Sequence, residues 1–121
     1  MKLETVYQAL QHLRCPFVPR EDMLHEAVAE CLRNEGISFV HEAKLDSHCR
    51  IDFLVEDIGI EIKKGRPNTK ILSSQLRRYA SCEAIKALIV IAPYSVKLPT
   101  GIYGKPVYCI NLNVLWGVAL S

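Results

Sequence analysis

The sequence lacks any apolar run that is long enough to span a membrane. The longest apolar stretches among its 121 residues are 87–92 and 114–120, whereas a spanning helix needs about 20 apolar residues in succession. The first residues, MKLE, lead directly into alternating polar and apolar residues and do not resemble a secretory signal peptide. From these two absences we expect a cytoplasmic protein with no membrane partner.

The sequence also lacks paired cysteines. Its five cysteines are scattered, at positions 15, 31, 49, 82 and 109, which disfavours a disulfide framework and is typical of a reducing compartment. His41, His48 and Cys49 lie close together in the sequence but do not have the spacing of zinc ligands. We therefore expect the cysteines to be ordinary core or surface thiols.

A large net charge is missing as well, since 15 basic residues nearly balance 13 acidic ones and the formal net charge is +2. Taken alone, this balance does not favour a nucleic-acid-binding protein. The charges are unevenly distributed, however. Residues 63–78 contain six basic residues and no acidic one, so the rest of the chain has 9 basic and 13 acidic residues and a charge of −4. Such a block is either a solvated face or an anion-binding surface.

The composition itself is that of a normal globular protein, with 50% hydrophobic and 23% charged residues. Neither a repeat nor a low-complexity linker divides the sequence, so we predict a single domain over residues 1–121. It would comprise an N-terminal helical extension (1–15), a core (21–92), and a C-terminal strand with an apolar tail (93–121). The tail, which contains Trp116, would close the core or form a subunit interface.

Hydrophobic periodicity predicts the secondary structure. Helical spacing covers 3–13, where Pro16 stops the pattern, then 21–34 and 70–82, and strand patterns cover 37–45, 50–55, 58–63, 84–92 and 107–110, with 114–120 compatible with either. The order of the core is therefore helix, three strands, helix, strand. A three-strand meander followed by a crossover helix predicts an α/β (α+β) fold in which helices flank a mixed β-sheet.

The chemically informative stretch is residues 50–64, RIDFLVEDIGIEIKK, which the periodicity divides into two strands. Alternation in the first strand predicts one apolar face and places Asp52 on the opposite face. In the second strand it places Glu61 and Lys63 opposite the isoleucines. The apolar face of the first strand is expected to contain Ile51, Phe53 and Val55.

The connection between these two strands decides how the polar residues meet. A two-residue turn at 56–57 places Asp52 directly across from Glu61, whereas a four-residue loop at 56–59 places it across from Lys63. In either register the three polar side chains crowd one face, about 5–8 Å apart. Because carboxylates this close repel each other, we expect a divalent cation that prefers oxygen ligands, Mg²⁺ or Mn²⁺, between them.

The lysine two residues beyond the glutamate adds a second chemical group to this face. It can orient a metal-bound water and offset charge on a phosphate, so the set predicts metal-assisted hydrolysis of a phosphodiester. The same residues also fit a surface hairpin with an ordinary cross-strand ion pair. Spacing alone leaves both interpretations open.

Asp52, eight further residues and the triplet EIK at 61–63 resemble the core motif of the PD-(D/E)xK nuclease superfamily, which includes restriction enzymes, Holliday-junction resolvases and RecB-type nucleases. The element order over 21–92 is similar to the αβββαβ core of that superfamily. Ile51 stands where the name of the superfamily has proline, a position that varies among members. The resemblance implies a restriction-endonuclease-like core and Mg²⁺-dependent hydrolysis of DNA, with Mn²⁺ as a substitute.

Two features outside the triplet add to the resemblance. Gln75 and Tyr79 stand at i and i+4 on the following helix, as in members with a Gln-x-x-x-Tyr motif, and would face the same side. Glu26 lies on the helix before the strands, where many members place a further metal-binding acid. Glu30 lies one turn further along, and the adjacent His25 matches the histidine ligand of the RecB-type branch, so all three residues are candidates for the helix ligand.

The resemblance assigns roles to individual residues. Asp52 and Glu61 would bind the divalent cation. The Ile62 carbonyl would be a third ligand, and Glu26 would complete the metal shell. Lys63 would position the attacking water and stabilise the charged transition state.

The resemblance also gives the basic block a place beside the site, because the block leads out of the catalytic strand and along the following helix. Gln75 would contact the phosphate backbone or a metal-bound water, and Tyr79 would pack beside the site or contact the nucleic acid. Glu42 and Arg50, on neighbouring strands, would support the site or form a structural ion pair. The basic residues expected to contact phosphates are Lys64, Arg66, Lys70, Arg77 and Arg78.

Little of the chain lies outside the predicted core, so we expect recognition of DNA structure, such as a branch, a flap or a duplex end, and not of a long base sequence. Because these substrates present two strands, a homodimer with two sites is an expected assembly. Two alternatives stay open: a non-catalytic nucleic-acid-binding or assembly subunit with the same fold, and an enzyme that cuts RNA. The sequence does not separate an endonuclease from an exonuclease.

Overall fold

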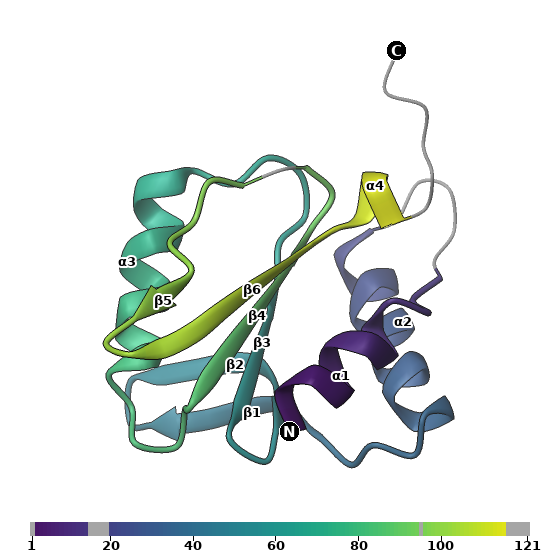
Figure 1. Ribbon diagram of the computed structural model, residues 1–121, viewed down its shortest axis with the longest axis horizontal. Coiled ribbons are helices and arrows are strands. Elements are labelled where there is room, and N and C mark those ends of the chain that lie inside the picture. Colours follow the sequence, from purple (N-terminus) through teal and green to yellow (C-terminus); the bar gives the residue numbers. More distant parts are fainter. Residues whose placement is uncertain (1, 15–19, 95, 116–121) are drawn as a thin grey trace.

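The chain folds into three layers, with a sheet between two layers of helices (Figure 1). Helices α1 (Lys2–Leu10) and α2 (Glu21–Asn34) cover one face of a six-stranded mixed sheet, and α3 (Thr69–Ala80) covers the other. This arrangement confirms the expected α+β fold with a mixed sheet flanked by helices. The computed structural model describes residues 2–14, 20–94 and 96–115.

The six strands are β1 (Val40–Asp46), β2 (Cys49–Val55), β3 (Ile58–Ile62), β4 (Ala87–Ala92), β5 (Gly101–Ile102) and β6 (Lys105–Asn111), and a short helix α4 (Leu112–Leu115) follows β6. Strands β1, β2 and β3 form an antiparallel meander. Strands β3, β4 and β6 are parallel, and β5 pairs antiparallel with β6, which gives the order β1-β2-β3-β4-β6-β5. The chain reaches β4 from β3 through α3, the kind of crossover that parallel neighbours require.

The helices are held by apolar stripes that face the sheet. On α2, the buried stripe includes Leu24, Val28 and Leu32. These side chains share one core cluster with α1 and with Ile60 of β3. On the other face, Leu76 and its neighbours on α3 form a second cluster with β4. The two clusters explain why helical spacing was informative for both helices.

Strand β4 lies in the middle of the molecule, and all six of its residues are buried. Ile89 and Ile91 pack with α1 and α2, whereas Leu88 and Val90 pack with α3. A strand that is covered on both faces reads as a continuous apolar run because neither face needs polar residues. Its parallel neighbour β3 carries Glu61, a residue of the candidate site.

Gly59 on β3 is required by close packing. A Cβ atom at this position would lie 2.5 Å from Ile51 Cδ1 and 2.9 Å from Ile85 Cδ1. Carbon atoms in ordinary contact are about 3.5–4.0 Å apart, so no side chain fits without displacing its neighbours. The glycine therefore lets the side chains of Ile51 and Ile85 pack directly against the backbone of β3.

Helix α3 begins with a side-chain cap. The Asn68 side chain accepts a hydrogen bond from the backbone N–H of Ile71 at 3.1 Å. An asparagine at this position satisfies a helix N–H that has no intrahelical partner. The cap fixes where the chain turns from the loop after β3 into α3, and so helps to fix where the basic residues of α3 start.

Several predicted boundaries are wrong for identifiable reasons. β1 begins at Val40 and not at 37, because the N–H of Ile37 closes the end of α2 by bonding to the Leu32 carbonyl at 2.9 Å. β4 begins at Ala87 and not at 84, because residues 84–86 still belong to the turn after α3, where Ile85 N–H bonds to Cys82 O. The first helix ends at residue 10, and single-turn bonds continue its pattern to residue 13.

Two further outcomes concern the C-terminal part. The sequence did not predict β5, a two-residue strand that pairs with the start of β6. Residues 112–115 form α4, but the rest of the apolar tail with Trp116, like the loop around Pro16, lies outside the described residues. Within the described part of the chain, no helix has the length and apolar character that crossing a membrane requires.

Candidate active site where β2 parts from β3

The hairpin of β2 and β3 adopts the first of the two predicted registers. Val55 pairs with Ile58 and Phe53 with Ile60, which leaves a two-residue turn at 56–57. Continuing this register places Asp52 across from Glu61, since the paired residue numbers keep a constant sum. The turn therefore brings the two carboxylates of the predicted motif to opposite positions on the two neighbouring strands.

Strand β2 does not keep one apolar face throughout, which corrects the sequence-based prediction. Phe53 and Val55 pack with α1 and α2, but Ile51 packs with α3 on the other face of the sheet. The change of face occurs where β2 leaves β3, and across from it Glu42 of β1 has a positive φ of 52°. Strict alternation assumes a regular strand, and the bend at Asp52 breaks it.

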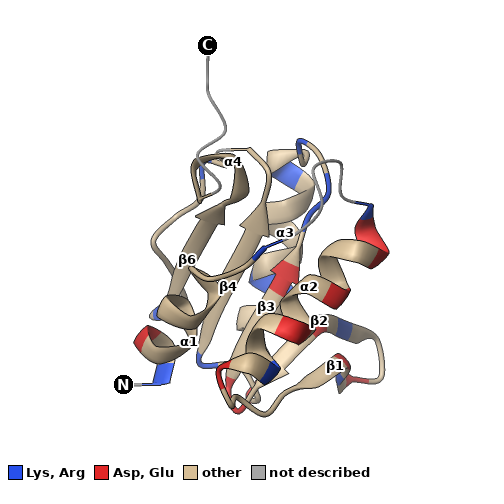
Figure 2. Cartoon of the chain, turned by 90° about the vertical axis from the view of Figure 1, so that its right-hand side faces the viewer, with Lys and Arg blue, Asp and Glu red and all other residues tan. Residues whose placement is uncertain are grey.

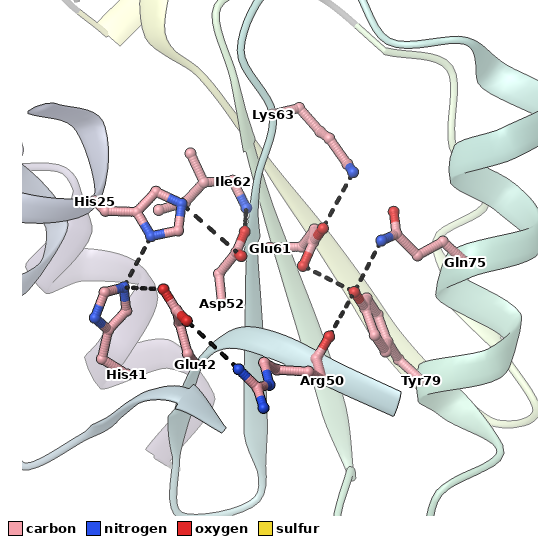
Figure 3. Close-up of polar contacts among 10 residues, drawn as sticks. All are labelled: His25, His41, Glu42, Arg50, Asp52, Glu61, Ile62, Lys63, Gln75 and Tyr79. Carbon is pink, nitrogen blue, oxygen red and sulfur yellow. Dashed lines mark hydrogen bonds and ion pairs between the residues drawn. The ribbon is translucent and has the colours of Figure 1, made fainter. Parts of the chain in front are cut away.

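The Asp52 carboxylate lies at this bend, between the two strands (Figure 3). Its Oδ2 accepts a hydrogen bond from the Ile62 backbone N–H at 2.7 Å. Its Oδ1 lies 3.8 Å from His25 Nε2. Where the β2–β3 pairing ends, the acceptor for this β3 N–H is thus a side chain and not a backbone carbonyl. The bond fixes the position of the carboxylate relative to β3.

Glu61 is the buried member of the set, at 4% exposure, and among the described residues no other charged side chain is buried. Its Oε2 lies 3.1 Å from Lys63 Nζ, and its Oε1 accepts a hydrogen bond from the Tyr79 hydroxyl at 3.1 Å. Burial, and then the charge of Asp52, raise the pKa of Glu61 to about 7, while Lys63 and Tyr79 oppose this rise. A carboxyl that titrates near neutrality at the base of a cluster is typical of functional sites.

Tyr79 and Gln75 of α3 support Glu61 from the side. Gln75 Nε2 donates to the Tyr79 hydroxyl at 2.9 Å, which confirms that the two residues face the same side. The hydroxyl also lies 3.1 Å from the Arg50 carbonyl, but its single proton can serve either that oxygen or Glu61 at one time. Burial, and the neighbouring Glu61, raise the pKa of Tyr79 far above its usual range, so the phenol keeps this proton.

The Oε1 atom of Gln75 is buried and has no hydrogen-bond partner within the described part of the chain. A buried acceptor without a partner costs free energy, about 1–3 kcal/mol by mutational measurements. This oxygen belongs to a residue that lines a cleft of about 400 Å³ together with Lys63. One acceptor of the site thus stays unsatisfied beside this cleft.

The basic residues divide between this cleft and its surroundings. Lys70 and Arg78 line the cleft beside Lys63 and Gln75, with Ile71 and Ser74 completing its wall. Arg66 lies outside it, with its guanidinium over the ring of Tyr94. Lys64 and Arg77 are exposed and are not among the lining residues. The structure therefore brings together part of the predicted phosphate-contacting set.

On the opposite face, His25 of α2 is the helix residue that approaches Asp52. It forms a hydrogen bond through Nδ1 with His41 Nε2 at 2.9 Å. His41 stacks on Phe53, with ring centroids 4.6 Å apart. Glu42, next to His41, forms the cross-strand ion pair with Arg50 at 3.6 Å. The pair predicted for Glu42 and Arg50 is present beside the site.

Glu26 and Glu30 point to a different partner. Both carboxylates lie 3.4 Å from Arg33 Nη1 on the same helix, and Glu26 is 70% exposed. Of the three candidates for the helix ligand, the structure places His25 next to Asp52. The role of Glu26 as a metal ligand stays a prediction.

Acidic residues predominate on α2 (Figure 2), whereas the charged residues of α3 are all basic. Glu21, Asp22, Glu26 and Glu30 lie on α2, and its side of the sheet has a cleft of about 460 Å³ lined by several of them and by the two histidines. The basic residues of α3 lie behind the sheet in that view. An anionic ligand would therefore approach from the α3 side.

Sequence reasoning missed two contacts of the site. The hydrogen bond between His25 and His41 joins residues 16 positions apart on different elements, and no local pattern signals it. The stacking of Arg66 on Tyr94 joins two loops that come together because the strands before them, β3 and β4, are parallel.

The chain was also compared with known proteins. No protein-family model, curated protein or solved structure matches it.

Proposed function

We propose that this chain is a metal-dependent nuclease of the PD-(D/E)xK type, with a restriction-endonuclease-like core, that hydrolyses DNA phosphodiester bonds with the help of Mg²⁺. The observation that carries the proposal is the buried Glu61, held between Lys63 and Tyr79 and close enough to Asp52 for the two carboxylates to repel each other. A merely structural ion pair needs no second acid. A second acid beside the first suits a divalent cation.

The donor set fits Mg²⁺ better than a cation that is caged by protein. The described residues contain no group of three or more His, Cys, Asp and Glu side chains suited to hold a metal. Mg²⁺ usually binds through one or two carboxylates and keeps several waters. Asp52, Glu61 and the Ile62 carbonyl would hold it, and Mn²⁺ would substitute. When bound, the cation would supply an activated water and neutralise developing charge.

The remaining groups of the site suit the chemistry of a phosphodiester. Lys63 contacts Glu61 and also lines the cleft with Lys70 and Arg78, so its ammonium can stabilise negative charge on a phosphate. Gln75 lines the same cleft and donates its amide N–H to the Tyr79 hydroxyl, so it supports the group that holds Glu61. Tyr79 holds Glu61 in orientation without giving up its proton.

The proposed substrates are branched, flapped or duplex DNA, and a homodimer with two sites would suit substrates with two strands. The basic cleft on the α3 side favours a polyanion there.

The second candidate function is a non-catalytic nucleic-acid-binding subunit. The observation in its favour is that Lys63 already pairs with Glu61, as in a structural ion pair.

The decisive experiment is a cleavage assay with Mg²⁺ on four-way junctions, flaps, single strands and linear duplexes. We expect the wild-type protein to cut at least one of these, and Glu61→Gln and Lys63→Met to lose about 100-fold or more of the rate. Glu83→Gln and Lys44→Met are matched controls, because both residues are exposed and lie outside the site.

Two results would count against the nuclease. If the wild-type protein binds DNA but cuts none of the substrates with Mg²⁺ or Mn²⁺, the non-catalytic subunit replaces it. If Glu61→Gln and Lys63→Met cut as fast as the two control variants, the proposed site is not the active site.

A further inference from the structure

Arg66 and Tyr94 form a stacked pair on the two loops that leave β3 and β4. The guanidinium carbon lies 4.9 Å from the centroid of the tyrosine ring. Tyr94 remains 40% exposed, and Arg66 is exposed as well. An aromatic ring under an arginine, both open to solvent, presents flat surfaces on which another planar group can stack.

The pair lies at the same edge of the sheet as the proposed active site. Strands β3 and β4 are parallel, so the loops after them leave at one edge. At that edge the Lys63 N–H donates to the Ile91 carbonyl at 2.8 Å. Arg66 and Tyr94 each follow this bonded pair by three residues, a distance of at most about 10 Å of extended chain. The stacked pair is therefore within a few nucleotides of Lys63.

The surroundings of the pair carry positive charge and an exposed apolar side chain. Residues 63–78 contain no acidic residue. The cleft of about 400 Å³ next to Lys63 is lined by Lys70 and Arg78, and Ile71 at its rim is 68% exposed. A basic groove beside an aromatic surface is the combination by which proteins hold single-stranded nucleic acid: cations follow the phosphates and flat side chains stack on the bases.

We propose that Arg66 and Tyr94 are a stacking platform for one unpaired base of single-stranded DNA whose phosphates lie along the cleft of Lys63, Lys70 and Arg78. Bases inside an intact duplex are stacked on both faces, so only the end base pairs present a free face. The platform therefore selects substrates with a single-stranded segment, such as a flap or a frayed end. This inference rests on the proposed nuclease function and specifies its substrate.

Binding without cleavage tests the platform directly. A fluorescein-labelled oligothymidylate of about 12 nucleotides and a blunt duplex of equal length are titrated with protein in EDTA, and the Kd is read from fluorescence anisotropy. Tyr94→Leu removes the ring. We expect it to weaken single-strand binding about tenfold, within the range measured for one stacked base, and to leave duplex binding unchanged.

Three variants serve as comparisons. Tyr94→Phe keeps the ring and is expected to bind as the wild type does. Arg66→Lys keeps the charge but loses the planar guanidinium, so it should also weaken single-strand binding selectively. Tyr103→Leu is the matched control, because Tyr103 is exposed but precedes β6, at the opposite end of the parallel strands. If Tyr94→Leu destabilises the fold, Arg66→Lys carries the test.

The outcomes separate the platform from the nuclease. The platform is overturned if Tyr94→Leu and Arg66→Lys bind the single strand as the wild type does, or if they lose as much affinity for the duplex as for the single strand. The nuclease proposal stands in either case if the wild-type protein cuts DNA. A wild-type protein that binds neither probe overturns the platform as well, and the cleavage assay then decides the nuclease separately. A selective loss that Tyr94→Phe restores supports the platform.

Discussion

The burial of Glu61 predicts that this single carboxyl makes the protein less stable as the pH rises. Its pKa is raised from 4.5 to about 7, chiefly by burial and next by the charge of Asp52. Because the folded state then binds the proton more tightly than the unfolded state does, the stabilisation is fully present below pH 4.5 and is lost as the pH rises through about 7. Each pKa unit corresponds to about 1.4 kcal/mol, so the full effect is about 3 kcal/mol.

Urea unfolding of the wild-type protein and of Glu61→Gln, in the absence of divalent cations, measures this effect. Glutamine keeps the shape of a protonated glutamate but does not titrate, so the difference in unfolding free energy between the two proteins isolates Glu61 from the histidines. We expect the wild type to lose about 3 kcal/mol relative to Glu61→Gln between pH 4.5 and 8. A difference that stays flat, or that grows in favour of the wild type with pH, would refute the reasoning.

The remaining predictions follow from single contacts. At pH 8, Mg²⁺ at about 100 times its Kd should raise the unfolding free energy of the wild-type protein by about 2.7 kcal/mol, measured by thermal unfolding, and leave that of Glu61→Gln unchanged. An equal stabilisation of both proteins would contradict a metal site at Glu61. Gly59→Ala should lower the free energy of unfolding measured in urea by about 1–3 kcal/mol, because the new Cβ meets Ile51 and Ile85; an unchanged free energy would contradict the close packing at this position. Asn68→Ala should lower the free energy of unfolding in urea by about 1 kcal/mol, because the cap on α3 is lost. Asn68→Asp keeps an acceptor and should retain most of that stability.

Much of the core was predictable because local rules governed it. The stripes of α2 and α3 and the continuous apolar strand β4 follow from periodicity and burial. Alternation limited the hairpin to two registers, and the structure adopts the one with a two-residue turn at 56–57. These features depend on contacts between residues near in sequence or on strands with a defined register.

The parts that could not be predicted depend on how the elements meet. Ile51 changes face because β2 bends away from β3, and the sequence around it still alternates regularly. Whether His25 or Glu26 lies beside Asp52 depends on how α2 is rotated about its own axis against the sheet. A shift of one residue along the helix would bring the other side chain to that position. Tyr94 is part of a loop whose place beside Arg66 comes only from the parallel pairing of β3 and β4.

The hydrogen bond from Ile62 to Asp52 has a consequence for the choice of cation. With Oδ2 already accepting from a backbone N–H at 2.7 Å, Oδ1 is the better-placed oxygen of Asp52 for a ligand, which favours monodentate coordination. Ca²⁺ takes six to eight oxygens and often uses bidentate carboxylates, whereas Mg²⁺ is satisfied by single oxygens in an octahedron completed by water. The hydrogen bond made at the bend in β2 thus favours single-oxygen coordination by Asp52, and with it the smaller ion, Mg²⁺.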